Sequence, residues 1–449
     1  MAKPTALSGF PELLPADRSV EQQVIESLAR TFELHGFASI ETRAVEPMDQ
    51  LLRKGETSKE VYVLKRLQDT EGADSGMGLH FDLTVPFARY VLENAGKLEF
   101  PFRRYQIQKV WRGERPQEGR FREFTQADID IVGRDDLPFH HDIEVARVMV
   151  AALSGLDFLP GFVLQVNNRK LIQGFYAGLG APDPERVMQV IDKLDKLPAD
   201  KVRDQLVADA GLSGEQADRC LALAQIASSD ESFVGQVRGL GVSHPLLDEG
   251  LSELAAVIAG CAGVVSERVQ VVADLKIARG LDYYTGTVFE TRLSGYESLG
   301  SICSGGRYDA LASDGRTSYP GVGISFGLSR TLVPLISKGQ LTSSRSVPSV
   351  VLVALNEEET RPAADELANR LRARGIACEV APNADKFGKQ IRAAERRGIP
   401  FVWFTRDDGG HEVKDIRSGD QTSADPDQWT PPSNDLRPRV INTFKEQAL

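Results

Sequence analysis

The sequence predicts a protein of more than one domain, with an α+β first part and an α/β last part. Its 449 residues exceed what one hydrophobic core usually serves, so we expect two or three domains. In the first part, strand-like runs at 103–112 and 122–133 flank turn-forming residues, which predicts a β-hairpin. A 3.6-residue apolar period from about 168 to 262 predicts a mostly helical insertion. Beyond residue 349, strands alternate with helices.

The N-terminal elements follow from local patterns. Residues 19–35 place their apolar side chains on one helical face, and Ser19 with Gln22 fits a capping box, so we expect a helix that begins at Ser19. Segments 61–67 and 79–84 flank a polar stretch rich in Gly, Asp and Ser, which predicts a second hairpin.

The polar segment 338–348 predicts a flexible linker between domains. The expected domains are therefore residues 1–337, a core that contains the helical insertion, and residues 349–449, a separate α/β domain of ordinary size.

Composition narrows the class of protein. The chain is 41% hydrophobic and 26% charged, as globular proteins are, and we expect neither a membrane span nor a signal peptide. Its four cysteines are scattered, which argues against a zinc site or a disulfide framework and favours a cytoplasmic location. A net charge of −11 repels nucleic acid, so any such partner must meet a local basic patch.

Arginine on predicted strands is the main chemical clue, because no Walker A, dinucleotide or nucleophile-elbow motif is present. Residues 101–122 hold seven basic side chains against two glutamates. Such a hairpin suits phosphate, although a solvated basic hairpin is the plainer alternative. Residues 278–290, "ARGLDYYTGTVFE", place Arg279 and Gly280 before a strand that needs neither. An edge strand preceded by a turn is the alternative there.

Five stretches together resemble the class II aminoacyl-tRNA synthetases in their histidyl form. The segment "WRGERP…GRFREFTQADIDIVG" (111–133) is similar to motif 2, and "YPGVGISFGLSR" (319–330) to motif 3. The stretches "RGLDYYTGTVFE" (279–290) and "CSGGRYDAL" (303–311) resemble the two histidyl signatures, and "FDLTVPFARY" (81–90) resembles the loop that holds the substrate amine. The likeness covers essentially the whole chain.

The resemblance implies a mixed, largely antiparallel sheet flanked by helices, and a C-terminal anticodon-binding domain. It also implies a homodimeric histidine–tRNA ligase. Such an enzyme joins L-histidine to ATP with Mg²⁺ and transfers the histidyl group to the 3′ end of tRNA(His).

Residue roles are carried over from the matching motifs. The implied catalytic residues, which grip the α-phosphate, are Arg112 and Arg279. The implied ATP-binding residues are Arg112, Glu114, Arg120, Phe124 and Arg330, with Glu114 at the adenine amine and Phe124 under the ring. The implied histidine-binding residues are Asp82, Leu83, Thr84, Gln126, Asp130, Tyr283, Tyr284 and Gly305. No side chain is assigned to a metal.

Several of these assignments have plainer alternatives. Asp82 could be a helix N-cap, and Gly305 a turn glycine. Adjacent residues of a regular strand face opposite ways, so Tyr283 and Tyr284 can share a pocket only if a bulge or turn intervenes. In the C-terminal domain, a basic helical face suits tRNA or merely solvent; its residues are Lys386, Lys389, Arg392 and Arg396.

Three residues depart from the family pattern. Arg43 stands where motif 1 has a proline, which puts the dimer interface in doubt, while Ser329 replaces a glutamate and His80 an arginine. Two other functions are weighed: the regulatory paralogue of an ATP phosphoribosyltransferase, and an RNA-binding regulator with an inactive core. The first typically lacks "RGLDYY" and the C-terminal domain, and the second would lack a phosphate-gripping arginine.

Overall fold

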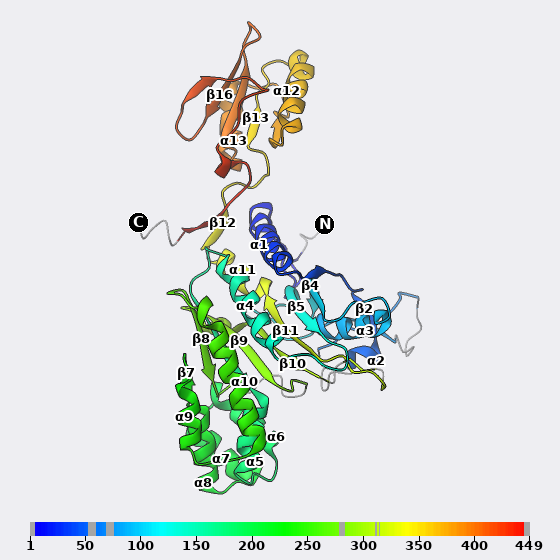
Figure 1. Ribbon diagram of the computed structural model, residues 1–449. Helices are drawn as coiled ribbons and strands as arrows, with labels where there is room; N and C mark the ends of the chain where they lie inside the picture. Colours follow the sequence, from blue (N-terminus) through cyan, green and yellow to red (C-terminus); the bar gives the residue numbers. More distant parts are fainter. Residues whose placement is uncertain are drawn as a thin grey trace. The chain divides into compact units, whose positions relative to one another are not determined.

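The computed structural model describes residues 5–52, 60–68, 76–277, 283–309, 312–313 and 315–443 (Figure 1). The chain divides into two compact units. The first comprises Met1–Pro11 and Ile25–Pro334, and the second comprises Glu12–Val24 and Leu335–Leu449. Helix α1 (Pro15–Leu34) contributes to both. It begins before Ser19, so the predicted cap is wrong: Ser19 lies inside the helix, where its carbonyl accepts from Gln23 Nε2 at 3.0 Å.

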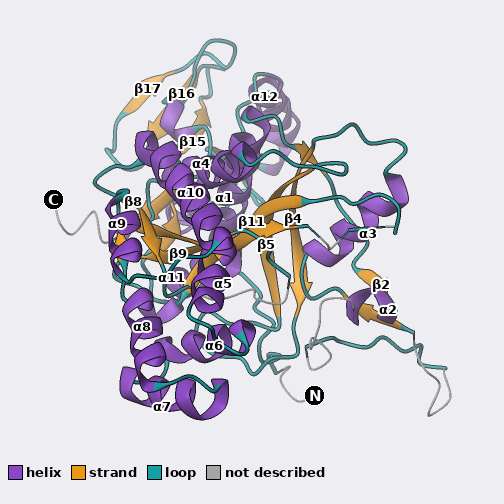
Figure 2. Ribbon diagram, turned by 60° about the horizontal axis from the view of Figure 1, so that its bottom comes forward, coloured by secondary structure: helices purple, strands orange, loops and turns teal. Residues whose placement is uncertain are grey.

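A mixed sheet forms the centre of the first unit (Figure 2). Among the described residues it has nine strands, in the order β1-β4-β5-β11-β10-β9-β6-β8-β7. Their bounds are β1 Ala38–Ser39, β4 Phe102–Trp111, β5 Glu123–Val132, β6 Phe162–Asn168, β7 Ala227–Ser228, β8 Val269–Asp274, β9 Thr287–Leu293, β10 Ser301–Tyr308 and β11 Gly321–Gly327. Only the pairs β1–β4 and β6–β8 run parallel within this sheet. The predicted, largely antiparallel sheet and the hairpin of β4 and β5 are confirmed.

Side-chain alternation gives the sheet two different faces. On one face, Tyr105 of β4 packs against Phe32 of α1, with ring centroids 5.7 Å apart. On the same face, Arg307 of β10 pairs with Asp142 of helix α4 (His140–Ser154) at 2.7 Å. The opposite face presents even-numbered residues of β4, β5 and β10 toward helix α3 (Thr84–Asn94), where Arg104 lies 4.2 Å from the ring of Phe87.

The segment predicted as a helical insertion holds a group of helices (Figure 2). They are α5 Arg169–Gly178, α6 Pro184–Ile191, α7 Ala199–Ala210, α8 Gly214–Ala224, α9 Ser232–Gly239 and α10 Pro245–Cys261. Asn168 caps α5 by accepting from the backbone N–H of Lys170. Helices α5 and α10 cross closely because both contribute a glycine: a Cβ at Gly174 would lie 2.2 Å from the backbone of Leu247.

A small antiparallel pair stands beside the large sheet. Strands β2 (Val45–Pro47) and β3 (Met77–Leu79) pair and flank the short helix α2 (Met48–Leu51). In the second predicted hairpin, Val63 bridges Gly78, and the expected turn falls largely on 69–75, outside the described residues. Helix α11 (Leu328–Ser337) follows β11.

The second unit contains the predicted α/β domain. Its five-stranded sheet has the order β14-β13-β15-β16-β17, with β14, β13 and β15 parallel. The bounds are β13 Val351–Val353, α12 Arg361–Ala373, β14 Cys378–Val380, α13 Phe387–Arg397, β15 Phe401–Thr405, β16 His411–Asp415 and β17 Gln421–Ser423. Strands β12 (Leu341–Ser343) and β18 (Val440–Asn442) also pair. The segment 338–348, predicted as a flexible linker, therefore contains strand β12.

No helix in the part of the chain that the structure describes is both long and apolar enough to cross a membrane.

Candidate active site

Polar side chains form a row across the face of the sheet that is directed toward α3. Asp128 of β5 is opposite Ser325 of β11, which is opposite Ser304 of β10. Ser304 is in turn opposite Glu290 of β9. Directly opposed residues of antiparallel strands lie on the same face, so four strands that are distant in sequence bring these groups together.

Glycines clear space one step along the same strands. Gly323 is the partner of both Asp130 and Gly306. A Cβ at position 323 would lie 2.1 Å from Asp130 Oδ1, and one at position 306 would lie 2.8 Å from the ring of Tyr284. The missing side chains therefore make room for an acid and an aromatic ring.

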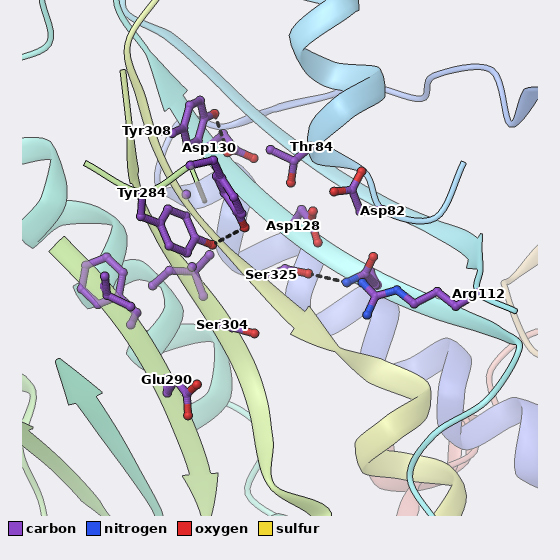
Figure 3. A pocket seen from close by; sticks show the side chains of 17 residues that line it. Asp82, Thr84, Arg112, Asp128, Asp130, Tyr284, Glu290, Ser304, Tyr308 and Ser325 are labelled. Atoms are coloured by element: carbon purple, nitrogen blue, oxygen red, sulfur yellow. Dashed lines mark hydrogen bonds between the residues drawn. The ribbon is translucent and has the colours of Figure 1, made fainter. Parts of the chain in front are cut away.

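The row borders a cavity of about 180 Å³, which we call the acidic cavity (Figure 3). Its charged lining residues among those described are Asp82, Asp128, Asp130, Glu290 and Arg112. Seven of the eight predicted histidine-binding residues line it: Asp82, Thr84, Gln126, Asp130, Tyr283, Tyr284 and Gly305. The exception is Leu83, which is fully buried and occupies the N-cap position of α3. Gly305 lies within β10, so the alternative of a turn glycine is wrong.

Asp130 is held by two buried partners. Arg104, which is 0% exposed, places Nη2 2.6 Å from Asp130 Oδ2. Tyr308 donates its hydroxyl hydrogen to Asp130 Oδ1 at 2.7 Å. Burial raises the pKa of Tyr308 well above its usual value, so the phenol stays protonated and remains a donor.

Both adjacent tyrosines reach the acidic cavity because they precede the regular strand. Strand β9 begins at Thr287, and Tyr283 donates its hydroxyl hydrogen to Tyr284 Oη at 2.8 Å. The ring centroids are 4.2 Å apart. Burial also raises the pKa of Tyr284. Residues 278–282, including the predicted catalytic Arg279, lie outside the described residues.

Asp82 lies just before α3 and is bonded to it. Its Oδ1 accepts a hydrogen bond from the backbone N–H of Val85 at 3.1 Å, in the first turn of α3. Leu83 occupies the N-cap position, so the alternative that Asp82 is the N-cap is wrong. The same carboxylate lines the acidic cavity, and its bond to the helix holds its direction.

A second cavity of about 220 Å³ contains the predicted nucleotide residues, and we call it the arginine cavity. Those lining it are Arg112, Glu114, Arg120, Phe124 and Arg330. The Arg112 guanidinium lies 5.2 Å from the centre of the Phe124 ring, and its Nε donates to the carbonyl of Phe81. Arg120 pairs with Glu114 at 3.2 Å. The hairpin thus carries cations, an acid and a half-buried aromatic ring, which suit a nucleotide.

The two cavities adjoin. Both are lined by Arg112, Gln126, Ser304 and Ser325, and Gln126 donates to Ser325 Oγ at 2.9 Å. The arrangement can place a small cationic molecule beside a polyphosphate, with one arginine at the border.

Sequence reasoning missed several polar residues of this site. Among them are Arg104, Asp128, Glu290, Ser304, Tyr308 and Ser325. The strand alternation in "QADID" (126–130) was a signal for Asp128, because it places Gln126, Asp128 and Asp130 on one face. Nothing in the local sequence marks Glu290 or Arg104, whose roles depend on strand register.

The three departures from the family pattern have structural partners. Arg43 pairs with Glu46 at 3.2 Å. Ser329 Oγ accepts from the backbone N–H of Thr125, which links α11 to β5. His80 donates through Nε2 to the carbonyl of Lys109, and burial lowers the pKa of its imidazole.

The predicted basic face of the second unit lies on α13 and just before it. All four of its residues are exposed: Lys386, Lys389, Arg392 and Arg396. Lys389 pairs with Asp385 at 2.7 Å. Across the described ranges, no group of three or more His, Cys, Asp or Glu side chains could hold a metal ion.

Known proteins resemble this chain over nearly its whole length. A family model described as histidyl-tRNA synthetase matches residues 9–331, and one described as an anticodon-binding domain matches residues 349–427. The chain is 60% identical to the histidine–tRNA ligase of Cutibacterium acnes, covering 99% of this chain and 100% of that protein. Identity to the histidine–tRNA ligase of Micrococcus luteus is 58%, with 98% and 99% covered. The crystal structure of histidyl-tRNA synthetase from Nostoc sp. PCC 7120 superposes with a TM-score of 0.85 at 34% identity, covering 95% of this chain and 98% of that chain.

Proposed function

The chain belongs to the histidyl-tRNA synthetase family, and on that premise we propose that it is a histidine–tRNA ligase. The histidine carboxylate attacks the α-phosphorus of ATP, pyrophosphate leaves, and histidyl-adenylate forms. The 3′-terminal ribose hydroxyl of tRNA(His) then attacks the carbonyl carbon, and AMP leaves. The observation that carries this proposal is the position of Arg112, which lines both cavities where the two substrates would meet.

We assign phosphate stabilisation to arginines. Negative charge grows on the α-phosphate in the transition state, and fixed cations there lower the barrier. Arg112 is placed for this role, and the resemblance adds Arg279. Arg330 would meet the far end of the triphosphate, with Arg120 beside it. Glu114 would accept from the adenine amine, and Phe124 would stack on the base.

We assign the amino acid to the acidic cavity. Asp82 and Thr84 would hold the ammonium group, and Gln126 would contact the amino acid near Arg112. Asp130 would accept from one imidazole nitrogen, and Tyr283 with Tyr284 would meet the ring. An imidazole has two distinct nitrogens, so an acid and a phenol discriminate it well from other side chains.

We propose three further features on general grounds. Mg²⁺ would enter with the ATP phosphates, which commonly bind it together with water molecules in enzyme sites. The tRNA would meet the basic face of α13, whose exposed cations suit phosphate. The enzyme would work in the cytoplasm as a homodimer, as the resemblance implies. The two alternative functions are not favoured, because Arg112 and Arg330 line the arginine cavity and the relatives are named ligases.

Amino-acid-dependent exchange of pyrophosphate into ATP tests the function. With each of the twenty amino acids supplied in turn, we expect exchange with histidine and background rates with the other nineteen. Exchange with a different amino acid, or with none, would contradict the proposal.

A further inference from the structure

Asp128 is a buried carboxyl group to which neither the family motifs nor the proposed mechanism gives a role. It lies between Gln126 and Asp130 on the same face of β5, and its side chain lines the acidic cavity. Asp128 is 2% exposed. Its Oδ1 has no hydrogen-bond partner among the described residues. A desolvated carboxyl oxygen without a partner is costly, which suggests that a donor is supplied from outside the chain.

The surroundings of Asp128 are rich in acids. The ionisable groups that influence its charge are Arg104 from β4, Asp130 from β5, Asp82 before α3, Tyr284 before β9 and Cys303 from β10. Ser325 of β11 also lowers its pKa through a hydrogen bond. Arg104 is the cation among them, and it is already paired with Asp130 at 2.6 Å. Glu290 and Arg112 complete the charged lining of the cavity. The cavity is therefore short of positive charge.

We propose that Asp128 is a further substrate-binding residue, whose Oδ1 accepts a hydrogen bond from the α-ammonium group of histidine. The inference rests on the proposed function. An ammonium group has three donors. Asp82 and Thr84 supply acceptors on one side, and Figure 3 shows Asp128 next to both. The ring end of the cavity already has its own acid in Asp130, which Tyr308 and Arg104 hold in place.

This role predicts that a proton leaves when histidine binds. Burial raises the pKa of Asp128 to about 7, against the lowering effects of Arg104 and of a hydrogen bond with Ser325. Part of the free protein therefore carries a proton on this carboxyl group near neutral pH, and a bound cation favours the charged form. Histidine binding near pH 7 should release protons from Asp128.

Isothermal titration calorimetry of the full chain tests the inference with two ligands. L-histidine carries the ammonium group, and 3-(imidazol-4-yl)propanoate has the same ring and carboxylate without it. In Asp128→Asn we expect the Kd of histidine to rise about tenfold or more, and the Kd of the propanoate to change less than about twofold. Repeating the titration in buffers of different ionisation enthalpy counts the protons released. Fewer protons should be released on histidine binding in the variant than in wild type.

The control variant is Glu267→Gln, which removes one exposed acid elsewhere and should behave as wild type. Equal weakening of both ligands by Asp128→Asn would show that Asp128 only maintains the cavity and would overturn the inference. Unchanged histidine affinity would overturn it as well. If wild type bound histidine but supported no pyrophosphate exchange, the proposed function would fail, while the two-ligand comparison could still be read.

Discussion

Two neighbouring cavities on one face of the sheet carry opposite charge. Among the described residues, four carboxylates and one arginine line the acidic cavity, whereas three arginines and one glutamate line the arginine cavity. Strands β5, β10 and β11 contribute to both linings, so the difference comes partly from a step of a few residues along these strands. Local charge would therefore direct an ammonium group to one cavity and a polyphosphate to the other, in a protein of net charge −11.

One arginine, Arg112, lies at the border between the two cavities, where the reaction would take place. Arg112 directly follows the hairpin strand β4 and belongs to both linings. Its Nε is fixed by the carbonyl of Phe81, next to the acid at position 82, so the guanidinium is oriented before ligand arrives. Fixed orientation lowers the cost of stabilising a developing charge.

The largest effect should follow removal of the border cation. For Arg112→Ala we expect kcat of histidine-dependent pyrophosphate exchange to fall about 100- to 1,000-fold, because a transition-state contact is lost. The measurement is steady-state exchange at saturating substrates. Arg219→Ala, which removes an exposed arginine of α8, is the matched control. A variant that lost only histidine affinity would place Arg112 in the acidic cavity alone.

Arg279→Ala should have the next largest effect. The resemblance places this arginine on the same α-phosphate, so we expect exchange to fall by a factor of about 100 or more with histidine affinity nearly unchanged. The rate of pyrophosphate exchange and the Kd of histidine, both measured on the same preparation, separate the effect on catalysis from the effect on binding. Wild-type exchange rates in this variant would remove Arg279 from the catalytic set.

Tyr308→Phe sharpens the comparison by affecting one cavity only. Loss of the hydroxyl leaves Asp130 Oδ1 without its 2.7 Å donor. We expect KM for histidine to rise about tenfold, with KM for ATP unchanged, since a hydrogen bond to a charged group is lost. Tyr176→Phe is the control, because that buried hydroxyl in α5 has no hydrogen-bond partner among the described residues. Equal changes in both KM values would contradict the independence of the cavities.

The smallest effect concerns stability. Because burial raises the folded-state pKa of Asp128 to about 7, the folded protein binds this proton more tightly than the unfolded chain does. The stability that this proton contributes to the wild type is therefore lost as the pH rises from about 4 through about 7. Asp128→Asn, which carries no such proton, should melt a few degrees above wild type at pH 8, and the difference should vanish near pH 4. Parallel melting curves at all pH values would place the proton elsewhere.

The sequence predicted the elements of the fold better than their limits. Apolar periodicity and turn residues located the β4–β5 hairpin and the helices of the insertion, because those signals are local. The start of α1 was misplaced because a Ser and a Gln at capping-box spacing also occur inside helices, where Ser19 lies. Strand β12 was missed because its partner, β18, is about a hundred residues away.

The residues of the site likewise fall into those that local sequence predicted and those that it did not. Residues carried by motifs, such as Asp82 and Arg330, line the expected cavities. Arg104 and Tyr308 were missed because their contacts with Asp130 depend on how β4, β5, β11 and β10 pair in the sheet, and no local pattern encodes that register. The problem of two adjacent tyrosines was solved by the late start of β9, a boundary that strand propensity does not fix.

Gly323 makes the position of Asp130 depend on a residue of the next strand. The carboxylate of Asp130 lies so close that a single added carbon at 323 would collide with it. Even an alanine at 323 would therefore displace the acid that we assign to the imidazole ring. A change that leaves every charged group in place could in this way weaken recognition of the ring.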